Sequence, residues 1–235
     1  MKTVLSEAKP SCRQLKTEVL ELLAAPDWES RLAELAGCPA RQVVNPLFTS
    51  LCSSDPLIRW HGITAFGEIA VHLPLEDARI ILRRLMWTLN DESGGIGWGA
   101  PEAMAEIMAR RSDLAGEYHR ILLSYIHEEE SGEDNYLELA PLRRGAVWGI
   151  FRLAGVHPEL ITPGVENLLL CLEDDDSGIR GMSGLALGRI GAGEAREPLE
   201  KLIDDASPYE MYRDRKLTKQ TVAEAAGEAL ALLSE

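Results

Sequence analysis

The sequence predicts an all-α fold, an α-α superhelix built from about five to six stacked helical hairpins. The main observation is a twelve-residue repeat with the same apolar and small positions, which occurs four times. Composition agrees, because hydrophobic residues make up 46% of the chain and aromatic residues only 6%. Closely packed helices suit this composition better than strands, which favour aromatic and β-branched residues. The four copies are Ile58–Ile69, Ile96–Ile107, Leu142–Leu153 and Ile179–Ile190.

Each copy is predicted to be the second helix of a hairpin. Its apolar residues recur at spacings of seven and then four, which places them on one face of an α-helix. A further column holds only small residues, which lets a neighbouring helix approach closely: Gly62, Ala100, Ala146 and Ser183. The copies begin roughly 37–46 residues apart, which is the range of HEAT and armadillo-type repeats.

The first helices of the hairpins are predicted from shorter apolar segments with helical spacing, each followed by a polar turn. These segments are Pro46–Leu51, Ile80–Leu89, Tyr118–Ile126, Val165–Leu172 and Pro198–Ile203. Acidic and Ser residues in the turns suit the N-terminus of the helix that follows. Residues 131–139 and Tyr209–Lys219 are predicted to be loops inserted between paired helices, on the face that often binds partners.

The two ends of the chain are degenerate, as the capping units of a solenoid are expected to be. Cys12–Ala24 and Trp28–Ala36 predict a hairpin at the N-terminus, and Thr218–Leu233 predicts the last helix. No long linker divides the chain. We therefore expect a single HEAT-like repeat domain over residues 1–235, with caps at about 12–38 and about 198–235.

The charge of the chain restricts the class of partner. The formal net charge is −14, whereas a protein that binds the phosphate backbone needs a basic stripe. Nucleic acid is therefore not an expected partner. Another protein or a peptide is expected, and a basic surface would complement the acidic chain, although acidity can also serve solubility alone. No feature of the sequence indicates an oligomeric state.

The sequence is typical of a soluble cytoplasmic protein. Residues 1–13 lack the apolar core of a signal peptide, and no segment has the roughly 20 apolar residues of a membrane span. We therefore expect no membrane partner. The cysteines, Cys12, Cys38, Cys52 and Cys171, form no CxxC pair and no cluster with zinc spacing, so we expect them to be reduced and free of metal.

The fourth copy resembles a known repeat. Ile179–Gly191 is similar to the HEAT-like repeat of the phycobilisome lyase type, which combines a hydrophobic–Arg pair, small residues and Ala-Leu-Gly-x-Ile-Gly. Ile58–Ile69 matches well, Leu142–Leu153 in part, and Ile96–Ile107 loosely, because Gly97 replaces the Arg. The resemblance implies the solenoid architecture. Members of this class include bilin lyases, which attach tetrapyrroles to partner proteins, and many proteins that only bind other proteins.

The Arg of the hydrophobic–Arg pair is expected to be structural. Arg59, Arg143 and Arg180 resemble the ladder residues of HEAT-type repeats, which pair with an acidic residue in the preceding turn. Asp55 and Asp176 lie four residues before Arg59 and Arg180 and suit that role. Such networks order a stack without a ligand.

One segment departs from the repeat pattern. Residues 90–102 contain four glycines within six positions, at 94, 95, 97 and 99. Gly97 and Gly99 would weaken the first turn of a helix that begins at Ile96. Exposed backbone N–H groups at such a position can receive an anion, yet no Gly-Lys-Ser/Thr follows, as a phosphate-binding loop requires.

Aromatic and charged residues gather around this segment. Trp98 aligns with Trp60 of the preceding copy, and His61 follows Trp60. Tryptophan at helical spacing is usually core, but it is also the residue most enriched at interface hot spots. A further column changes sign along the chain, with Glu68 and Glu106 in the first two copies. Arg152 and Arg189 occupy that column in the last two, so the groove is electrically polarised if the column faces it.

The leading hypothesis is a non-catalytic scaffold for protein–protein interaction, which binds its partner in a groove lined by the second helices. The candidate contacts are Trp60, His61, Glu92, Gly95, Gly97, Trp98, Glu102, Glu106, Arg143 and Arg144. No catalytic, cofactor-binding or metal-binding residue is predicted, and an enzyme is the less favoured class. The alternative is a lyase-like enzyme or chaperone that acts on a protein-bound prosthetic group such as a tetrapyrrole.

Overall fold

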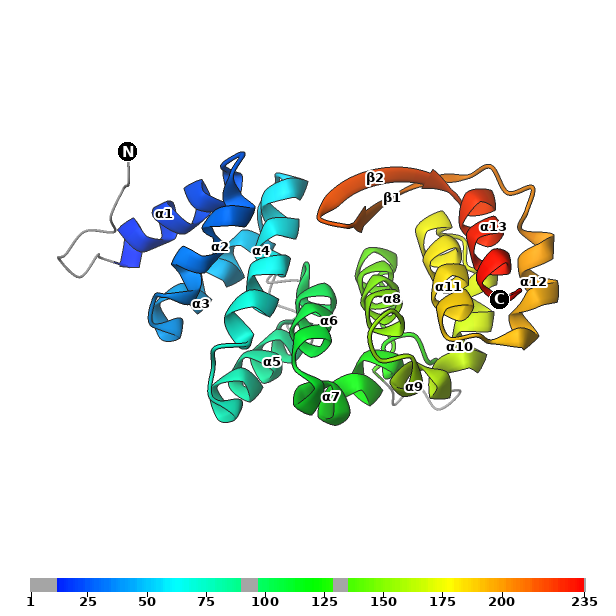
Figure 1. Cartoon of the computed structure of the whole chain (residues 1–235), viewed down its shortest axis with the longest axis horizontal. Coiled ribbons are helices and arrows are strands. Elements are labelled where there is room, and N and C mark those ends of the chain that lie inside the picture. Colours follow the sequence, from blue (N-terminus) through cyan, green and yellow to red (C-terminus); the bar gives the residue numbers. More distant parts are fainter. Residues whose placement is uncertain (1–11, 90–96, 129–134, 235) are drawn as a thin grey trace.

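The computed structural model describes residues 12–89, 97–128 and 135–234. Within these ranges the chain folds into consecutive helices followed by one β-hairpin and a last helix (Figure 1). The helices are α1 (Cys12–Ala24), α2 (Trp28–Ala36), α3 (Ala40–Leu51), α4 (Pro56–Ala70), α5 (Leu75–Leu89), α6 (Ala100–Arg110), α7 (Ser112–Ser124), α8 (Ala140–Ala154), α9 (Pro158–Ile161), α10 (Val165–Leu170), α11 (Ser177–Arg189), α12 (Arg196–Lys201) and α13 (Val222–Leu232). The hairpin consists of β1 (Pro208–Arg213) and β2 (Lys216–Thr221).

The helices form a repeat superhelix, as the sequence predicts. Helices α4, α6, α8, α11 and α13 pack side by side in one row, and each is preceded in the chain by a helix of an outer row (Figure 1). The outer row is α3, α5, α7, the α9–α10 segment and α12. At the N-terminus, α1 packs on α3 and α2 packs on α4. The matched segments of the sequence therefore occupy equivalent places in successive layers.

The predicted columns are the packing surfaces of this row. Ala65, Ala103 and Ala186 are fully buried, and so are Ala100, Ala146 and Ser183 of the small column. The small side chains let helix axes approach closely. One continuous core runs from Leu15 to Ala229, so each layer covers the apolar side of the next. The small residues of the repeat are thus explained by helix packing.

The acidic residues before α4 and α11 cap these helices. The Asp55 carboxylate accepts a hydrogen bond from the Leu57 N–H, and Asp176 accepts from the N–H groups of Gly178 and Ile179. These bonds satisfy N–H groups that have no partner within the helix. These two acidic turns therefore fix where α4 and α11 begin.

The arginine ladder pairs in the direction opposite to the predicted one. Arg143 forms an ion pair with Asp174 at 2.9 Å, and Arg180 with Asp205 at 2.7 Å. Each arginine therefore reaches the turn of the following unit. For Arg180, the carboxylate of the preceding turn, Asp176, already caps the N-terminus of α11. For Arg59 the corresponding turn falls within residues 90–96, outside the described residues.

The predicted loop at Tyr209–Lys219 is a β-hairpin instead, and the last helix begins at Val222 rather than at Thr218. The strands are antiparallel, with Tyr209 opposite Gln220 and Tyr212 opposite Leu217. A tight turn joins them through two residues with positive φ, Asp214 at 51° and Arg215 at 61°, as two-residue hairpin turns require. Apolar side chains then face the helices, and Met211 is fully buried.

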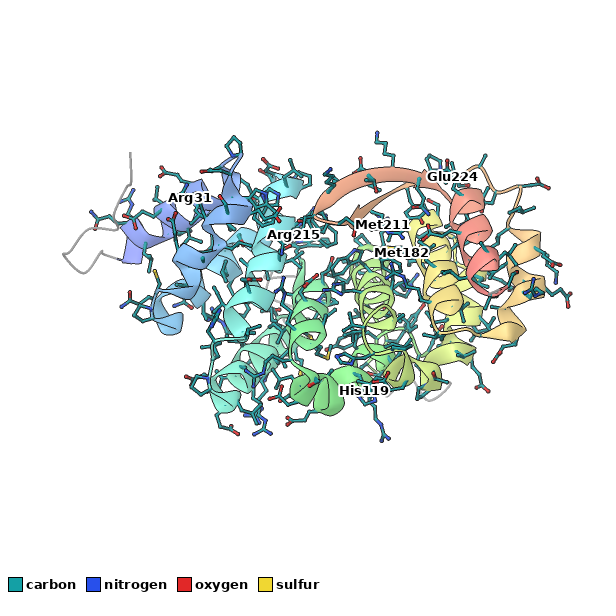
Figure 2. All side chains as sticks on the ribbon, viewed as in Figure 1. Arg31, His119, Met182, Met211, Arg215 and Glu224 are labelled. Carbon is teal, nitrogen blue, oxygen red and sulfur yellow. The ribbon has the colours of Figure 1, made fainter. Side chains whose placement is uncertain are left out.

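The hairpin reaches from the C-terminal cap back to the N-terminal half of the chain. It leaves α13 and arches past α11 and α8 towards α4 (Figure 1). Near its base, the Ser177 hydroxyl donates to the Pro208 carbonyl at 2.9 Å. At its tip, Arg215 (labelled in Figure 2) forms an ion pair with Glu29 of α2 at 2.5 Å. Residues 208–221 therefore link the first and last layers.

Helix α6 begins at Ala100, four residues later than predicted, because Gly99 precedes it in the left-handed conformation, with φ of 71°.

We predict that Gly99→Ala lowers the free energy of unfolding by about 1–2 kcal/mol. A Cβ atom there would also lie 3.1 Å from the Leu51 side chain. Gly116→Ala is the matched control, since Gly116 is helical and a Cβ there meets nothing within 4 Å. This control should stabilise the protein by about 0.5–1 kcal/mol.

Urea unfolding of both variants measures the difference. Equal effects of the two substitutions would contradict the assigned role of Gly99.

Candidate functional site

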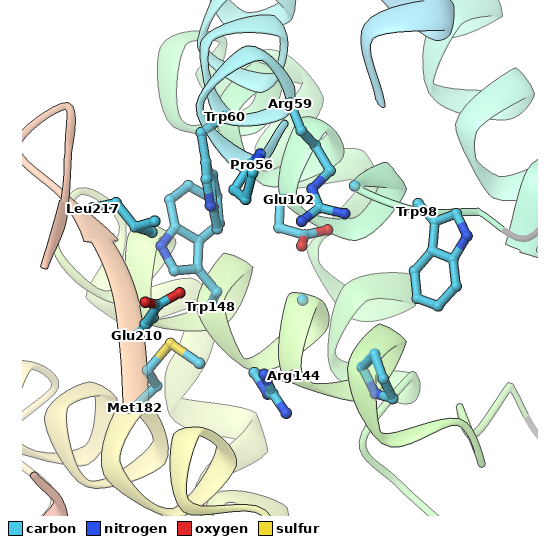
Figure 3. A pocket seen from close by; sticks show the side chains of 13 residues that line it. Pro56, Arg59, Trp60, Trp98, Glu102, Arg144, Trp148, Met182, Glu210 and Leu217 are labelled. Atoms are coloured by element: carbon cyan, nitrogen blue, oxygen red, sulfur yellow. The ribbon is translucent and has the colours of Figure 1, made fainter. Parts of the chain in front are cut away.

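A hollow of about 190 Å³ opens between the row of second helices and the hairpin (Figure 3). We call it the Glu102 hollow, after the carboxylate that lies within it. Side chains from α4, α6, α8, α11 and the hairpin line it, together with the turn before α6. The lining residues are Pro56, Arg59, Trp60, Trp98, Gly99, Glu102, Pro141, Arg144, Gly145, Trp148, Met182, Glu210 and Leu217.

The Glu102 carboxylate is held against the backbone of α8. A Cβ atom built on Gly145 would lie 2.6 Å from its Oε2 atom, so only glycine leaves room for the carboxylate. This Oε2 atom is buried and has no hydrogen-bond partner among the described residues. An unpartnered buried acceptor is costly unless a ligand or water satisfies it. The site therefore presents an acidic group that is available to a donor.

Burial also changes the acidity of this group. It raises the pKa of Glu102 to about 7, and the positive charge of Arg59 opposes the shift only in part. Desolvation disfavours the charged form of a carboxyl group. Figure 3 shows the Arg59 guanidinium beside the Glu102 carboxylate. The carboxyl group thus gains or loses its proton near neutral pH, which is a common property of functional sites.

Trp60 and Trp148 form the wall of the hollow next to the hairpin, and Tyr212 contacts both of them. Trp60 stacks on Tyr212, with ring centroids 4.7 Å apart and planes 6° apart. Trp60 also contacts Trp148, whose ring centroid is 4.8 Å away. The Trp148 indole N–H donates to the Tyr212 carbonyl at 2.7 Å. Because each ring is fixed by its neighbours, the wall is a rigid surface rather than a flexible one.

The charges around the hollow are mixed. Arg59 and Arg144 are basic, whereas Glu102 and Glu210 are acidic. Arg144 is already neutralised, because it forms an ion pair and hydrogen bonds with Asp176. Glu210 belongs to β1, and its side chain is 55% exposed at the mouth. The group that most needs a partner is therefore Glu102.

The structure brings four of the predicted contacts to this hollow: Trp60, Trp98, Glu102 and Arg144. Trp60 and Trp98 are both half-buried and lie on different sides of it (Figure 3). Gly97 is buried, and a Cβ atom there would lie 2.8 Å from the Leu89 side chain. Glu92 and Gly95 lie outside the described residues.

The other predicted contacts lie elsewhere. His61 is buried, stacks on Trp28 at 3.8 Å and contacts the Leu23 carbonyl through Nδ1 at 2.6 Å. Burial lowers the pKa of His61. Glu106 is 7% exposed and accepts a hydrogen bond from Arg152 at 2.8 Å. Arg143 belongs to the ladder. These three side chains therefore have structural partners and do not reach the hollow.

Sequence reasoning missed several residues of the hollow. Trp148 and Gly145 follow Arg144 on α8, but the spacing alone does not show that they face Glu102. Met182 is a core-like residue of the fourth copy, and Glu210 and Leu217 belong to the hairpin that was predicted to be a loop. The one available signal was the alternation of apolar and polar residues in Tyr209–Tyr212, which is typical of a strand.

Comparison with known proteins shows the fold class. No protein-family model and no curated protein matches the sequence. The chain is similar to an engineered protein of known crystal structure, with 20% identity and a TM-score of 0.51 over 94% of this chain and 96% of that one. A designed armadillo repeat protein in complex with the peptide (KR)4 is similar at 19% identity and a TM-score of 0.50, over 94% and 99% of the two chains.

A second engineered protein shares 17% identity and a TM-score of 0.50 over 93% of this chain and 98% of that one. Likenesses at such low identity concern the fold alone. The protein is thus an α-helical repeat solenoid of the armadillo and HEAT kind. The resemblance to the phycobilisome lyase subtype has no support beyond the residues that suggested it.

Among the helices of the described ranges, none combines the length and apolar content that a membrane span requires.

Proposed function

We propose that the protein binds a basic peptide or a basic segment of another protein, with one lysine or arginine side chain entering the Glu102 hollow. The observation that carries the proposal is the unpartnered, buried Oε2 atom of Glu102. A cationic side chain supplies N–H donors and a positive charge, and both would offset the cost of burying the carboxylate. No catalytic step is needed for this role.

The aromatic wall supports the same class of ligand. Trp60, Trp98 and Trp148 line the hollow around Glu102, and a tryptophan face attracts a cation within about 6 Å of its ring. The formal net charge of −14 would speed the approach of a basic partner. The similar designed armadillo repeat protein is in complex with (KR)4, an alternating Lys-Arg peptide, which makes such a peptide a suitable probe.

The size of the hollow favours a side chain over a tetrapyrrole. Its volume is about 190 Å³, whereas sites that enclose a drug-sized ligand have about 300–1,000 Å³. One lysine or arginine side chain fits the smaller space. The lyase-like alternative therefore gains no support from this hollow.

The test is a binding titration with a fluorescently labelled (Lys-Arg)4 peptide, followed by anisotropy. We expect Glu102→Gln to weaken binding by about 10-fold, because the amide keeps the shape and loses the charge. Glu197→Gln is the matched control. It removes one acidic group from α12, where the Glu197 side chain is 81% exposed, and leaves the hollow intact. Equal affinities of the two variants would mean that net charge alone attracts the peptide.

The pH dependence provides a second readout. A cation needs the ionised form of Glu102, whose pKa is about 7 in the free protein. Affinity of the wild type should therefore rise as the pH rises from 6 to 8. The Glu102→Gln variant should lack this increase, since its side chain does not titrate.

A further inference from the structure

A second cavity, of about 180 Å³, lies at the hairpin tip, where residues 212–215 line it. Trp148 lines both this cavity and the Glu102 hollow, whereas Tyr212 lines this cavity alone. Five arginines line the second cavity, which we call the arginine pocket: Arg110, Arg152, Arg189, Arg213 and Arg215. Only two acidic residues share the lining, Glu106 and Asp214. Such a concentration of arginine is unusual for a chain with a net charge of −14.

Most of these arginines are paired. Arg110 reaches Glu68 at 2.6 Å and Arg152 reaches Glu106 at 2.8 Å. Arg213 forms an ion pair with Glu228 at 2.7 Å, and Arg215 pairs with Glu29. Each carboxylate lies on a neighbouring element, so the pairs connect successive layers of the solenoid and the hairpin to its surroundings.

The pairing fails at Arg189. The column that changes sign in the sequence explains why. Arg152 of α8 pairs with Glu106, which occupies the same column on the preceding second helix, α6. For Arg189 of α11, the residue in this column on the preceding second helix is Arg152, which has the same charge. Within the described ranges, no carboxylate lies at ion-pair distance from the Arg189 guanidinium.

The partners of Arg189 leave most of its donors unused. Its Nη1 atom donates to the Phe151 carbonyl at 3.1 Å, and its guanidinium lies over the Phe151 ring at 3.8 Å. A guanidinium has five N–H donors in a planar fork. Burial lowers the pKa of Arg189 to about 10, the positive charges of Arg213 and Arg152 add to the effect, and the carboxylates of Glu228 and Asp214 oppose it only in part. An unpaired and partly buried charge of this kind destabilises the protein until an anion neutralises it.

We propose that the arginine pocket binds an oxyanion, namely a phosphate or carboxylate group, which Arg189 holds together with Arg152 and Arg213. The planar fork of arginine matches two oxygens of such a group and forms charge-assisted hydrogen bonds with them. Gly155 makes room for this arrangement, since a Cβ atom there would lie 2.8 Å from Nη1 of Arg189. The site is separate from the Glu102 hollow and does not depend on peptide binding.

Calorimetric titration of the full chain with inorganic phosphate tests the proposal, with O-phosphoserine and acetate titrated at the same ionic strength. We expect saturable binding of one phosphate per chain, with acetate weaker because it has fewer oxygens and less charge. Tighter binding of O-phosphoserine than of free phosphate would show that the group is carried on a larger molecule. Equal binding would show that the free anion is the ligand.

The variants must then follow the geometry. Arg189→Gln is expected to weaken phosphate binding by about 10-fold or more, and Arg189→Lys by less, because lysine keeps the charge but not the fork. Gly155→Ala should also weaken binding, although it leaves the charge unchanged. Arg83→Gln is the control, since Arg83 is exposed on α5 and loses the same charge. Absence of saturable binding, or equal losses in Arg189→Gln and Arg83→Gln, would overturn the site.

Discussion

Replacing Tyr212 by alanine is expected to lower the free energy of unfolding by about 3–5 kcal/mol, the range for large aromatic side chains removed from a core. Tyr212 is 4% exposed and stacks on Trp60 of α4. Its backbone carbonyl also accepts from Trp148 of α8. Loss of the ring would leave a cavity between these two helices and the hairpin tip, and the surroundings can close it only in part.

Tyr212→Phe separates the contribution of the ring from that of the hydroxyl. The Tyr212 hydroxyl lies 3.4 Å from Thr64 Oγ1, which is a long contact, so this variant should cost less than about 1 kcal/mol. Urea unfolding followed by tryptophan fluorescence and by circular dichroism measures both. If alanine is tolerated as well as phenylalanine, the hairpin does not pack on the helices as described.

The second large effect concerns pH. In the folded protein the pKa of Glu102 is about 7, against an ordinary value of 4.5. Between these two values the folded state keeps a proton that the unfolded state has released. The free energy of unfolding therefore falls as the pH rises through this range, by about 3–4 kcal/mol in total. Glu102→Gln cannot lose a proton, so it should match the wild type near pH 4.5 and exceed its stability by that amount at pH 8.

Glu106→Gln provides a comparison of opposite sign. The Glu106 carboxylate pairs with Arg152 at 2.8 Å, and its removal leaves a cation without its partner, so this variant should be less stable than the wild type at pH 8. Denaturant unfolding at several pH values measures the three proteins. A Glu102→Gln variant that loses stability at pH 8, as Glu106→Gln does, would contradict the burial of an unpartnered carboxylate.

The solenoid was predictable because its cause is local and repeated. Helical spacing and small residues at fixed positions determine how each layer packs on the next, so the copies in the sequence predict the row of second helices. The N-terminal hairpin was predicted with its observed bounds, Cys12–Ala24 and Trp28–Ala36. Helix starts were less predictable. Gly99 ends the turn before α6, and only its left-handed backbone conformation reveals that the helix begins after it.

The hairpin and the direction of the ladder could not be predicted from local pattern alone. Tyr212 is buried because Trp60 and Trp148 cover it, and these residues are distant in the sequence. Arg143 pairs with Asp174 rather than with an acidic residue closer in the sequence, because the stacking of α8 and α11 places the turn before α11 beside Arg143. In the Glu102 hollow, the sequence indicated Trp60, Trp98, Glu102 and Arg144. The glycine that makes room for the carboxylate, Gly145, becomes meaningful only when α8 is seen against α6.

The link between Arg215 and Glu29 changes how the molecule should come apart. An open array of layers with nearest-neighbour contacts unravels from its ends, one unit at a time. Here the terminal layers are tied to each other, and the Tyr212–Thr64 contact alone joins residues 148 positions apart. Fraying at the first layer then also breaks the Arg215–Glu29 pair, and unfolding of α4 also removes the Trp60–Tyr212 stack that holds the hairpin. We expect one cooperative transition in place of gradual melting, and slow refolding, because such distant parts must meet before the loop they close is stabilised.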